Sequence, residues 1–372
     1  MVSKHADTTI SSPPGLPVAA LAQWLVSQGI LRAGQPLQAE RMSGGQSNPS
    51  WCLRSGAQAW VLRAKPAPAA QLLPSAHAIE REYRILHALQ GTGVPVPRVH
   101  ALCEDESVIG VAFYLMDFVE GRIFRDATLP EVPAPERAAY FMAANEVLAC
   151  LHRVDWRTLG LHDFGRHEGY YSRLIQRWTR QYEAARTAPL EAMEQLARWL
   201  PQHVPLGADG AALTCITHGD YRIENLMFHP TRPEVVAVLD WELATLGHPL
   251  SDLSYNALAW RMPSGILRGY GDQDLQALGL PSEQAYVARY CEQMSEQMAK
   301  RTGLDRAAVE RDWPFYLAFN FFRLSAILLG IGQRERAGVA SNTTAREIAA
   351  MAEPVARWGW AIAQGQAPEF RH

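Results

Sequence analysis

The segment HGDYRIEN, residues 218–225, is answered downstream by LDWE, residues 239–242. Asp220 is followed five positions later by Asn225, and Asp240 closes an apolar segment. Mg-ATP phosphoryl transfer needs one carboxylate that orients the acceptor hydroxyl and takes its proton. It also needs an amide oxygen and a second carboxylate that hold the metal. The pattern therefore predicts Asp220 as a catalytic residue, and Asn225 and Asp240 as ligands of Mg2+.

The pattern is informative because three features occur together. An Asp and an Asn at this spacing are, on their own, more often part of a surface turn with capping carboxylates. Here HGD follows an apolar strand, the Asn stands at the required offset and the second Asp ends another apolar strand, which favours the functional interpretation. In the same loop we expect His218 to hold the geometry through hydrogen bonds. Arg222 is a candidate catalytic residue that contacts an anionic substrate group or phosphate, with an ordinary surface arginine as the alternative.

Composition limits the class of protein. The chain has 372 residues, of which 48% are hydrophobic and 20% charged, and its formal net charge is -3. These values are typical of a soluble globular protein with two lobes or two domains. The charge gives no broad basic field, so we expect neither nucleic acid nor a membrane surface as a partner.

The cysteines and the apolar segments bear on the compartment. Five dispersed cysteines favour reduced thiols and a cytoplasmic location. Residues 1–17 lack the apolar segment of a signal peptide. The longest apolar run, residues 315–331, contains Asn320 and Arg323. We therefore expect a buried helix there rather than a membrane span.

Hydrophobic spacing predicts an α+β chain in three parts. Residues 1–36 are expected to form a leader and an N-terminal helix, residues 37–120 a small lobe, and residues 121–372 a larger, mainly helical lobe. The small lobe is expected to hold an antiparallel sheet of five strands with one main helix, at about 78–90, after the third strand. Its predicted strands are 37–42, 50–53, 59–63, 98–103 and 111–116.

The larger lobe is predicted to be helical except around the opening motif. The expected helices are 135–153, 170–187, 190–200, 250–260, 282–301, 306–330 and 344–363. Three short apolar strands, 213–217, 226–229 and 235–239, are expected to carry the motif on their connecting loops.

Further motifs add a resemblance to a known family. The chain resembles the superfamily of aminoglycoside phosphotransferases and choline kinases, which has a protein-kinase-like two-lobed fold. More narrowly, it is similar to the kinase domains related to acyl-CoA dehydrogenase family members that act on hydroxyacyl-CoA. The resemblance covers roughly residues 37–330. Besides the opening motif it is carried by SGGQSN at 43–48, VLR at 61–63, LPSAH at 73–77, REY at 81–83, VPVP at 94–97, CED at 103–105 and MDFVEG at 116–121.

The resemblance implies roles for the small lobe. The loop between the first two strands would cover the nucleotide phosphates, and it contains Ser43, Gly44, Gly45, Gln46, Ser47 and Asn48. Arg63 would take the strand position where most kinases place a lysine that grips the phosphates, and Lys65 is the competing cation. Glu82 would be its helix partner, with Glu80 as the competitor. The hinge that hydrogen-bonds adenine would be Met116, Asp117, Phe118 and Val119.

The resemblance also places a bracing aspartate at Asp252, whose structural alternative is a helix cap. Sequence order then narrows the acceptor. DFG at 163–165 lies upstream of HGD, and APE at 367–369 lies at the extreme C-terminus, so neither matches the protein-kinase order. No G-x-x-x-x-G-K-[ST] loop is present, which excludes a P-loop kinase. A small-molecule acceptor is therefore favoured.

The first hypothesis is an ATP- and Mg2+-dependent kinase that phosphorylates a hydroxyl of a small molecule. By resemblance, the acceptor is a hydroxyacyl-CoA, and an aminoglycoside- or choline-type kinase is an alternative. Helices at 170–200 and 315–331 would form the acceptor wall, with Asn320 and Arg323 either in the pocket or paired within the core. A second hypothesis is a catalytically silent nucleotide-binding or scaffold protein that keeps the fold. A third is a metal-dependent hydrolase, for which the sequence offers no convincing ligand set.

Overall fold

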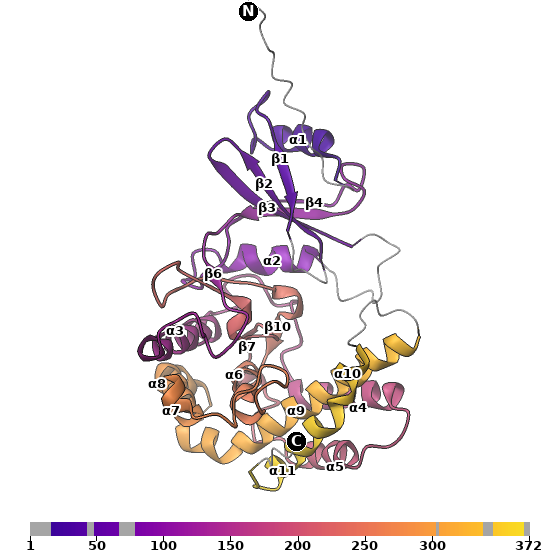
Figure 1. The fold of residues 1–372 in the computed structure, drawn as a ribbon, viewed down its shortest axis with the longest axis vertical. Helices are drawn as coiled ribbons and strands as arrows, with labels where there is room; N and C mark the ends of the chain where they lie inside the picture. The colour runs from indigo at the N-terminus through magenta and orange to yellow at the C-terminus, as the bar shows by residue number, and fades with distance from the viewer. Residues whose placement is uncertain (1–15, 43–47, 67–78, 303–304, 338–344, 368–372) are drawn as a thin grey trace, which may run out of the picture. The chain divides into compact units, whose positions relative to one another are not determined.

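The structure is a computed structural model that describes residues 16–42, 48–66, 79–302, 305–337 and 345–367 (Figure 1). The chain divides into two compact units. The N-terminal unit extends to Glu120 and includes Asp240–Leu243, and the C-terminal unit comprises Gly121–Leu239 and Ala244–His372.

The N-terminal unit is built on a five-stranded antiparallel sheet with the strand order β1-β2-β3-β5-β4. The strands are β1 (Gln38–Arg41), β2 (Ser50–Ser55), β3 (Gln58–Ala64), β4 (Val99–Cys103) and β5 (Phe113–Asp117). Two helices, α1 (Val18–Ser27) and α2 (Ile79–Leu89), lie on opposite sides of this sheet (Figure 1). All five strands and both helices were predicted.

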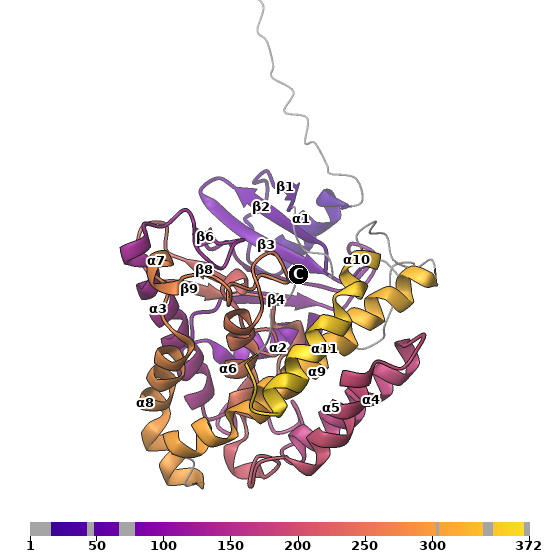
Figure 2. The same cartoon turned by 60° about the horizontal axis from the view of Figure 1, so that its bottom comes forward.

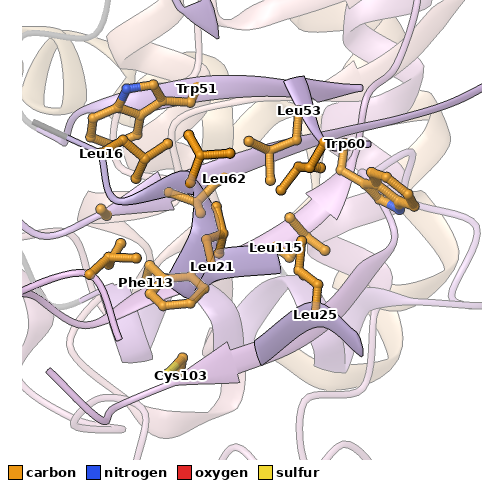
Figure 3. Packing of buried hydrophobic residues seen from close by; sticks show 14 of the residues in the cluster. Leu16, Leu21, Leu25, Trp51, Leu53, Trp60, Leu62, Cys103, Phe113 and Leu115 are labelled. Atoms are coloured by element: carbon orange, nitrogen blue, oxygen red, sulfur yellow. The ribbon is translucent and has the colours of Figure 1, made fainter. Parts of the chain in front are cut away.

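Strand alternation decides which side chains of β3 lie on the face of the sheet that α2 covers. Leu62 points into the apolar core, where it packs with Leu21 and Leu25 of α1 and with Leu53 of β2 (Figure 3). Because successive side chains of a strand point to opposite faces, Arg63 lies on the other face, the one covered by α2. The packing of Leu62 against α1 thus directs Arg63 to the opposite face of the sheet.

The C-terminal unit is mainly helical. Its helices are α3 (Ala134–Arg153), α4 (Tyr170–Ala185), α5 (Glu191–Trp199), α6 (Pro249–Ala257), α7 (Leu275–Leu278), α8 (Glu283–Thr302), α9 (Arg306–Arg336), α10 (Ala345–Ala350) and α11 (Ala352–Ala363). The long α9 packs against α4, α6, α10 and α11 (Figure 2).

Two small sheets carry the loops of the opening motif. One has the order β6-β8-β9, from β6 (Arg122–Ile123), β8 (Leu226–Phe228) and β9 (Val235–Val238). The other pairs β7 (Cys215–Thr217) with β10 (Thr245–Gly247). The predicted strands of this region are confirmed as β7, β8 and β9. The sequence missed β6, β10 and α7, since two to four residues are too few for a periodicity to emerge.

One predicted helix is divided. The pattern at 344–363 indicated a single helix, but α10 ends at Ala350 and α11 begins at Ala352. Pro354 lies in the first turn of α11. It has no N–H to donate to the carbonyl of Ala350, so a continuous helix would lose that bond.

Within the described residues, α9 alone has the length and apolar composition that crossing a membrane would require. Of its most apolar window, 78% is buried inside the structure. Core helices of soluble proteins share these properties. The expected buried helix at 315–331 is therefore confirmed.

Candidate active site

The loop after β7 is held together by His218. Its Nε2 donates to the carbonyl of Leu239 at 2.8 Å, and its Nδ1 accepts from the backbone N–H of Asp220 at 3.2 Å. The ring is fully buried. His218 therefore acts on the geometry of the loop, as its position in the motif predicted.

Asp220 and Asn225 are in direct contact. The Nδ2 of Asn225 donates to the Asp220 carboxylate and to its backbone carbonyl, both at 2.8 Å. Since both bonds use the amide nitrogen, the oxygen Oδ1 of Asn225 remains as its acceptor atom. The backbone N–H of Leu239 donates to the carbonyl of Asn225 at 2.9 Å, and Asp240 is the next residue in the chain.

Two more groups contact the Asp220 carboxylate. The Nε of Arg222 lies 3.1 Å from Oδ1 and 3.2 Å from Oδ2. The Tyr255 hydroxyl of α6 also hydrogen-bonds to Asp220, and burial together with this negative charge raises the pKa of Tyr255. Arg222 is thus an ion-pair partner of Asp220 rather than an isolated surface residue. No sequence motif had singled out Tyr255, which is distant from Asp220 along the chain.

Asp252 of α6 braces the loop from below. Its carboxylate accepts the backbone N–H of His218 at 2.6 Å and that of Gly219 at 2.9 Å. Its side chain is fully buried. Burial alone would raise the pKa of Asp252, but the hydrogen bonds from His152 and Gly219 and the charges of His152 and His218 outweigh it, so the pKa is lowered. The capping alternative is taken instead by His248, whose Nδ1 accepts from the N–H of Leu250.

A second carboxylate of the loop, Glu224, was not singled out by the sequence. It is buried, its Oε1 lies 3.1 Å from the Nε of Arg268, and its Oε2 lies 4.0 Å from Nη1 of Arg222. Burial raises the pKa of Glu224, and Arg222 opposes that shift. Arg268 adopts a positive φ of 69°. This region of backbone is costly for a non-glycine residue.

The N-terminal unit contains a charged cluster around Arg63. Its Nε lies 2.8 Å from the Glu82 carboxylate, and its Nη2 lies 3.1 Å from Oδ1 of Asp240. Burial by itself lowers the pKa of Arg63, but the charges of Glu82 and Asp240 outweigh it and the pKa is raised. Asn48 is buried and its Nδ2 lies 3.5 Å from Glu82. The structure thus brings together four predicted residues: Asn48, Arg63, Glu82 and Asp240.

The competing pair forms a separate contact. Lys65 binds Glu80 in an ion pair, and both side chains are partly exposed. Arg63 pairs with Glu82, as the favoured combination predicted, and Lys65 pairs with Glu80. Asp240 itself has a φ of 66°. A non-glycine residue in that conformation stores strain, which is common at functional positions.

The predicted hinge lies at the end of β5. The N–H of Asp117 donates to the carbonyl of Arg98 at 2.8 Å, and that of Phe118 donates to the carbonyl of Ala59 at 3.3 Å. The Asp117 carboxylate also lies 2.6 Å from Nε2 of His100. Met116 pairs with Val61 in the sheet, and Val119 follows in the connection to the C-terminal unit. The predicted phosphate-loop residues Ser43, Gly44, Gly45, Gln46 and Ser47 lie outside the described residues.

The two acceptor-wall residues have different surroundings. Asn320 is fully buried, and its Nδ2 donates to the Ser251 carbonyl at 3.1 Å and to the Ser254 hydroxyl at 2.8 Å. Of the two alternatives, it is a core residue. Arg323 instead reaches the loop, and its Nη2 donates to the carbonyl of Gly219 at 2.6 Å.

The ligand chemistry of the site is oxygen-based. Among the residues that the structure describes, no group of three or more His, Cys, Asp or Glu side chains could hold a metal ion. The predicted metal ligands Asn225 and Asp240 supply an amide oxygen and a carboxylate, the hard donors that Mg2+ accepts alongside water and phosphate.

Comparison with known proteins assigns the class. The model of the phosphotransferase enzyme family matches residues 38–290, more than half of the chain. The chain therefore belongs to the phosphotransferase enzyme family and is a small-molecule kinase of the aminoglycoside phosphotransferase type.

Individual relatives refine this assignment. A crystal structure from Ralstonia eutropha, whose proposed identity is an aminoglycoside phosphotransferase, is 44% identical, with a TM-score of 0.82 over 94% of this chain and 99% of that one. Mouse acyl-CoA dehydrogenase family member 10 is 43% identical over 352 residues, which are 94% of this chain. The chain spans only 31% of the length of that relative.

A more distant structure supports the fold alone. The aminoglycoside phosphotransferase APH(4)-Ia, solved with AMP-PNP and hygromycin B, is 14% identical, with a TM-score of 0.57 over 94% of this chain and 99% of that one. The predicted protein-kinase-like fold is confirmed by these two structures. The predicted resemblance to aminoglycoside phosphotransferases is confirmed by the family match and the Ralstonia structure, and that to acyl-CoA dehydrogenase family members by the mouse relative.

Proposed function

We propose that this kinase transfers the γ-phosphoryl group of ATP, in the presence of Mg2+, to a hydroxyl of a small molecule, and that its acceptor is a hydroxyacyl-CoA. The observation that carries the proposal is the arrangement around Asp220, whose carboxylate is oriented by Asn225 and Arg222 on a loop braced by Asp252. Such preorganisation of a base is what phosphoryl transfer needs from the protein.

Asp220 is the proposed base. It would orient the acceptor hydroxyl and take its proton as the hydroxyl oxygen forms a bond to the γ-phosphorus. The bond from the γ-phosphorus to the bridging oxygen then breaks, and ADP leaves. Arg222, which is paired with Asp220, would hold that carboxylate in place and stand near the transferred group.

Asn225 and Asp240 are the proposed holders of Mg2+. The donor set fits, because Asn225 commits its amide nitrogen to Asp220 and retains Oδ1, while Asp240 binds Arg63 through one carboxylate oxygen. When bound, the metal neutralises the charge of the phosphates. Asn225 accepts a backbone hydrogen bond from Leu239, the residue that precedes Asp240 in the chain.

The N-terminal unit is proposed to bind the nucleotide. Arg63, held by Glu82, would contact the phosphates, and the loop of residues 43–48 would cover them. The adenine would bind the backbone of residues 116–119. Because the N–H groups of Asp117 and Phe118 already donate within the sheet, we expect Val119 to provide the donor. The AMP-PNP complex of APH(4)-Ia supports nucleotide use by this fold.

The acceptor is proposed from the relatives. Mouse acyl-CoA dehydrogenase family member 10 takes its name from an acyl-CoA reaction. A kinase segment within such a protein is sensibly placed to act on an acyl-CoA that carries a hydroxyl. An aminoglycoside acceptor, as in the hygromycin B complex, is the competing choice.

The test is a kinase assay of the purified chain with ATP, Mg2+ and a panel of hydroxyacyl-CoAs, aminoglycosides and choline. Turnover is expected with a hydroxyacyl-CoA. In the Asp220→Asn variant we expect kcat to fall about 100- to 10,000-fold while Mg-ATP affinity stays nearly unchanged. Loss of turnover together with loss of nucleotide binding would contradict the role of Asp220. No turnover with any acceptor would favour the catalytically silent alternative.

A further inference from the structure

Arg323 is a buried cation beside the proposed base. Only 8% of its surface is exposed. Its Nη2 donates to the carbonyl of Gly219, the residue before Asp220, and its guanidinium carbon lies 4.8 Å from the centre of the Tyr255 ring. Tyr255 in turn hydrogen-bonds to Asp220. Arg323 is therefore linked to the Asp220 carboxylate in two ways: through Gly219, which precedes Asp220 in the chain, and through Tyr255, which hydrogen-bonds to it.

The charge of Arg323 is not balanced by an ion pair. Among the described residues, its polar contact is the Gly219 carbonyl, and its Nε is buried with no hydrogen-bond partner. Arg222, by contrast, is paired with Asp220. A buried charge that lacks an ion-pair partner is costly, and a buried donor left without an acceptor calls for an explanation such as a bound ion or ligand.

A second unpartnered donor lies beside it. The Arg323 guanidinium is 5.9 Å from the centre of the Trp178 ring on α4, and the indole Nε1–H of Trp178 is also buried without an acceptor. Helix α9, which carries Arg323, packs on both α4 and α6. Two N–H donors without a protein acceptor therefore lie on the neighbouring helices α4 and α9, and Arg323 of α9 also contacts the loop.

We infer that Arg323 and Trp178 form a subsite that binds an oxyanion of the acceptor, a carboxylate or a phosphate. This inference rests on the proposed function, because it concerns the acceptor of the same site. Both groups only donate hydrogen bonds, and Arg323 adds a fixed positive charge. They suit an anionic acceptor and repel a polycationic amino sugar.

The two residues allow the subsite to be tested apart from the loop. Arg323→Lys keeps the charge but removes the Nε donor and the planar array. Trp178→Phe keeps a six-membered aromatic ring beside Arg323 and removes the N–H together with the five-membered ring of the indole. Arg336→Lys is the matched control, since Arg336 lies on the same helix and donates to the carbonyl of Ala185, away from the loop.

The experiment measures the affinity of the full chain for three probes by titration calorimetry. They are hydroxybutyrate, which has a carboxylate, free CoA, which has phosphates, and butanediol, which has neither. Wild type is expected to bind at least one oxyanion probe more tightly than butanediol. Arg323→Lys is expected to weaken the affinity for that probe about 10- to 100-fold, and Trp178→Phe about 5- to 10-fold. Both variants should change the affinity for butanediol little. Arg336→Lys is expected to change none of them.

The probe that responds identifies the group: hydroxybutyrate indicates a carboxylate and CoA a phosphate. An equal loss for all three probes would mean that Arg323 only holds the loop, and it would overturn the inference. So would unchanged affinities, or a wild type that prefers butanediol. Turnover is scored separately in the kinase assay. A chain that binds oxyanions through Arg323 but never phosphorylates an acceptor refutes the proposed function alone, and a kinase that is indifferent to both substitutions refutes the subsite alone.

Discussion

The loop around Asp220 and the cluster around Arg63 are held in different ways. The loop is fixed by backbone groups, since Asp252 accepts the N–H groups of His218 and Gly219 and is itself fully buried. The cluster is fixed by charge, through ion pairs from Arg63 to Glu82 and to Asp240, whose side chain is 37% exposed. A fully buried carboxylate that accepts two backbone N–H groups has few substitutes, whereas an ion pair tolerates another cation. This difference is consistent with an arginine standing where most kinases have lysine.

The largest effect is expected from the residue that the charged cluster shares with the proposed metal site. Asp240→Ala removes a proposed Mg2+ ligand and leaves Arg63 paired with Glu82 alone. We expect kcat/KM to fall at least about 1,000-fold, because the phosphate charge is no longer neutralised. Nucleotide affinity, followed with a fluorescent ATP analogue, should then no longer respond to Mg2+. An affinity that still rises with Mg2+ as in wild type would argue against the role of Asp240.

The next effect tests the backbone-held region. Asp252→Asn replaces one acceptor oxygen by a donor that faces a backbone N–H, inside a fully buried site. We expect the free energy of unfolding to fall by about 3 kcal/mol, and kcat to fall with it. Urea denaturation measures the first quantity and the kinase assay the second.

Asp209 offers the matched control for that substitution. It also accepts backbone N–H groups, those of Tyr171 and Ser172, but at the more accessible start of α4. Asp209→Asn should cost only about 1 kcal/mol, the usual value of a helix cap, and leave kcat near that of wild type. Equal losses for the two variants would show that burial of Asp252 is not what fixes the loop.

The pH dependence of stability tests the same region through His248, which caps the start of α6. His248 is buried, and burial followed by the charge of His152 lowers its pKa from 6.5 to about 3. Because the folded-state pKa lies below the unfolded value, His248 contributes stability that is complete above pH 6.5 and is lost as the pH falls toward 3. At pH 5 this loss is about 2 kcal/mol.

Urea denaturation at pH 7 and pH 5 checks this prediction. In His248→Gln, the decrease in the free energy of unfolding from pH 7 to pH 5 should be about 2 kcal/mol smaller than in wild type, because the titrating group is gone. His203→Gln, at an exposed histidine, should leave the slope unchanged. Identical slopes for wild type and His248→Gln would place the acid sensitivity elsewhere in the chain.

The sequence predicted several residues of the candidate site, but few of the contacts between them. Asp220, Asn225 and Asp240 follow from local spacing, and the five strands from alternation and turn residues. Tyr255 and Arg268 could not be inferred, since each reaches the loop from a helix or turn far away in sequence. Trp178, of the proposed subsite, is likewise far in sequence from Arg323, the residue beside it. The same limit applies to the choice between Arg63 and Lys65. Strand alternation favoured Arg63, but only the packing of α2 shows which glutamate each cation meets.

The smallest effect decides whether charge alone holds the cluster. Arg63→Lys keeps the cation and should lower kcat/KM for ATP by about tenfold or less, whereas Arg63→Met should lower it by about 100-fold or more. Lys65→Met is the matched control, because Lys65 pairs with Glu80 on the same unit, and its effect should be within about twofold. Steady-state kinetics at varied ATP measure all three variants. If Arg63→Lys is as damaging as Arg63→Met, the planar guanidinium with its bonds to both Glu82 and Asp240 is required. The N-terminal cluster would then be as geometrically exacting as the loop that Asp252 braces.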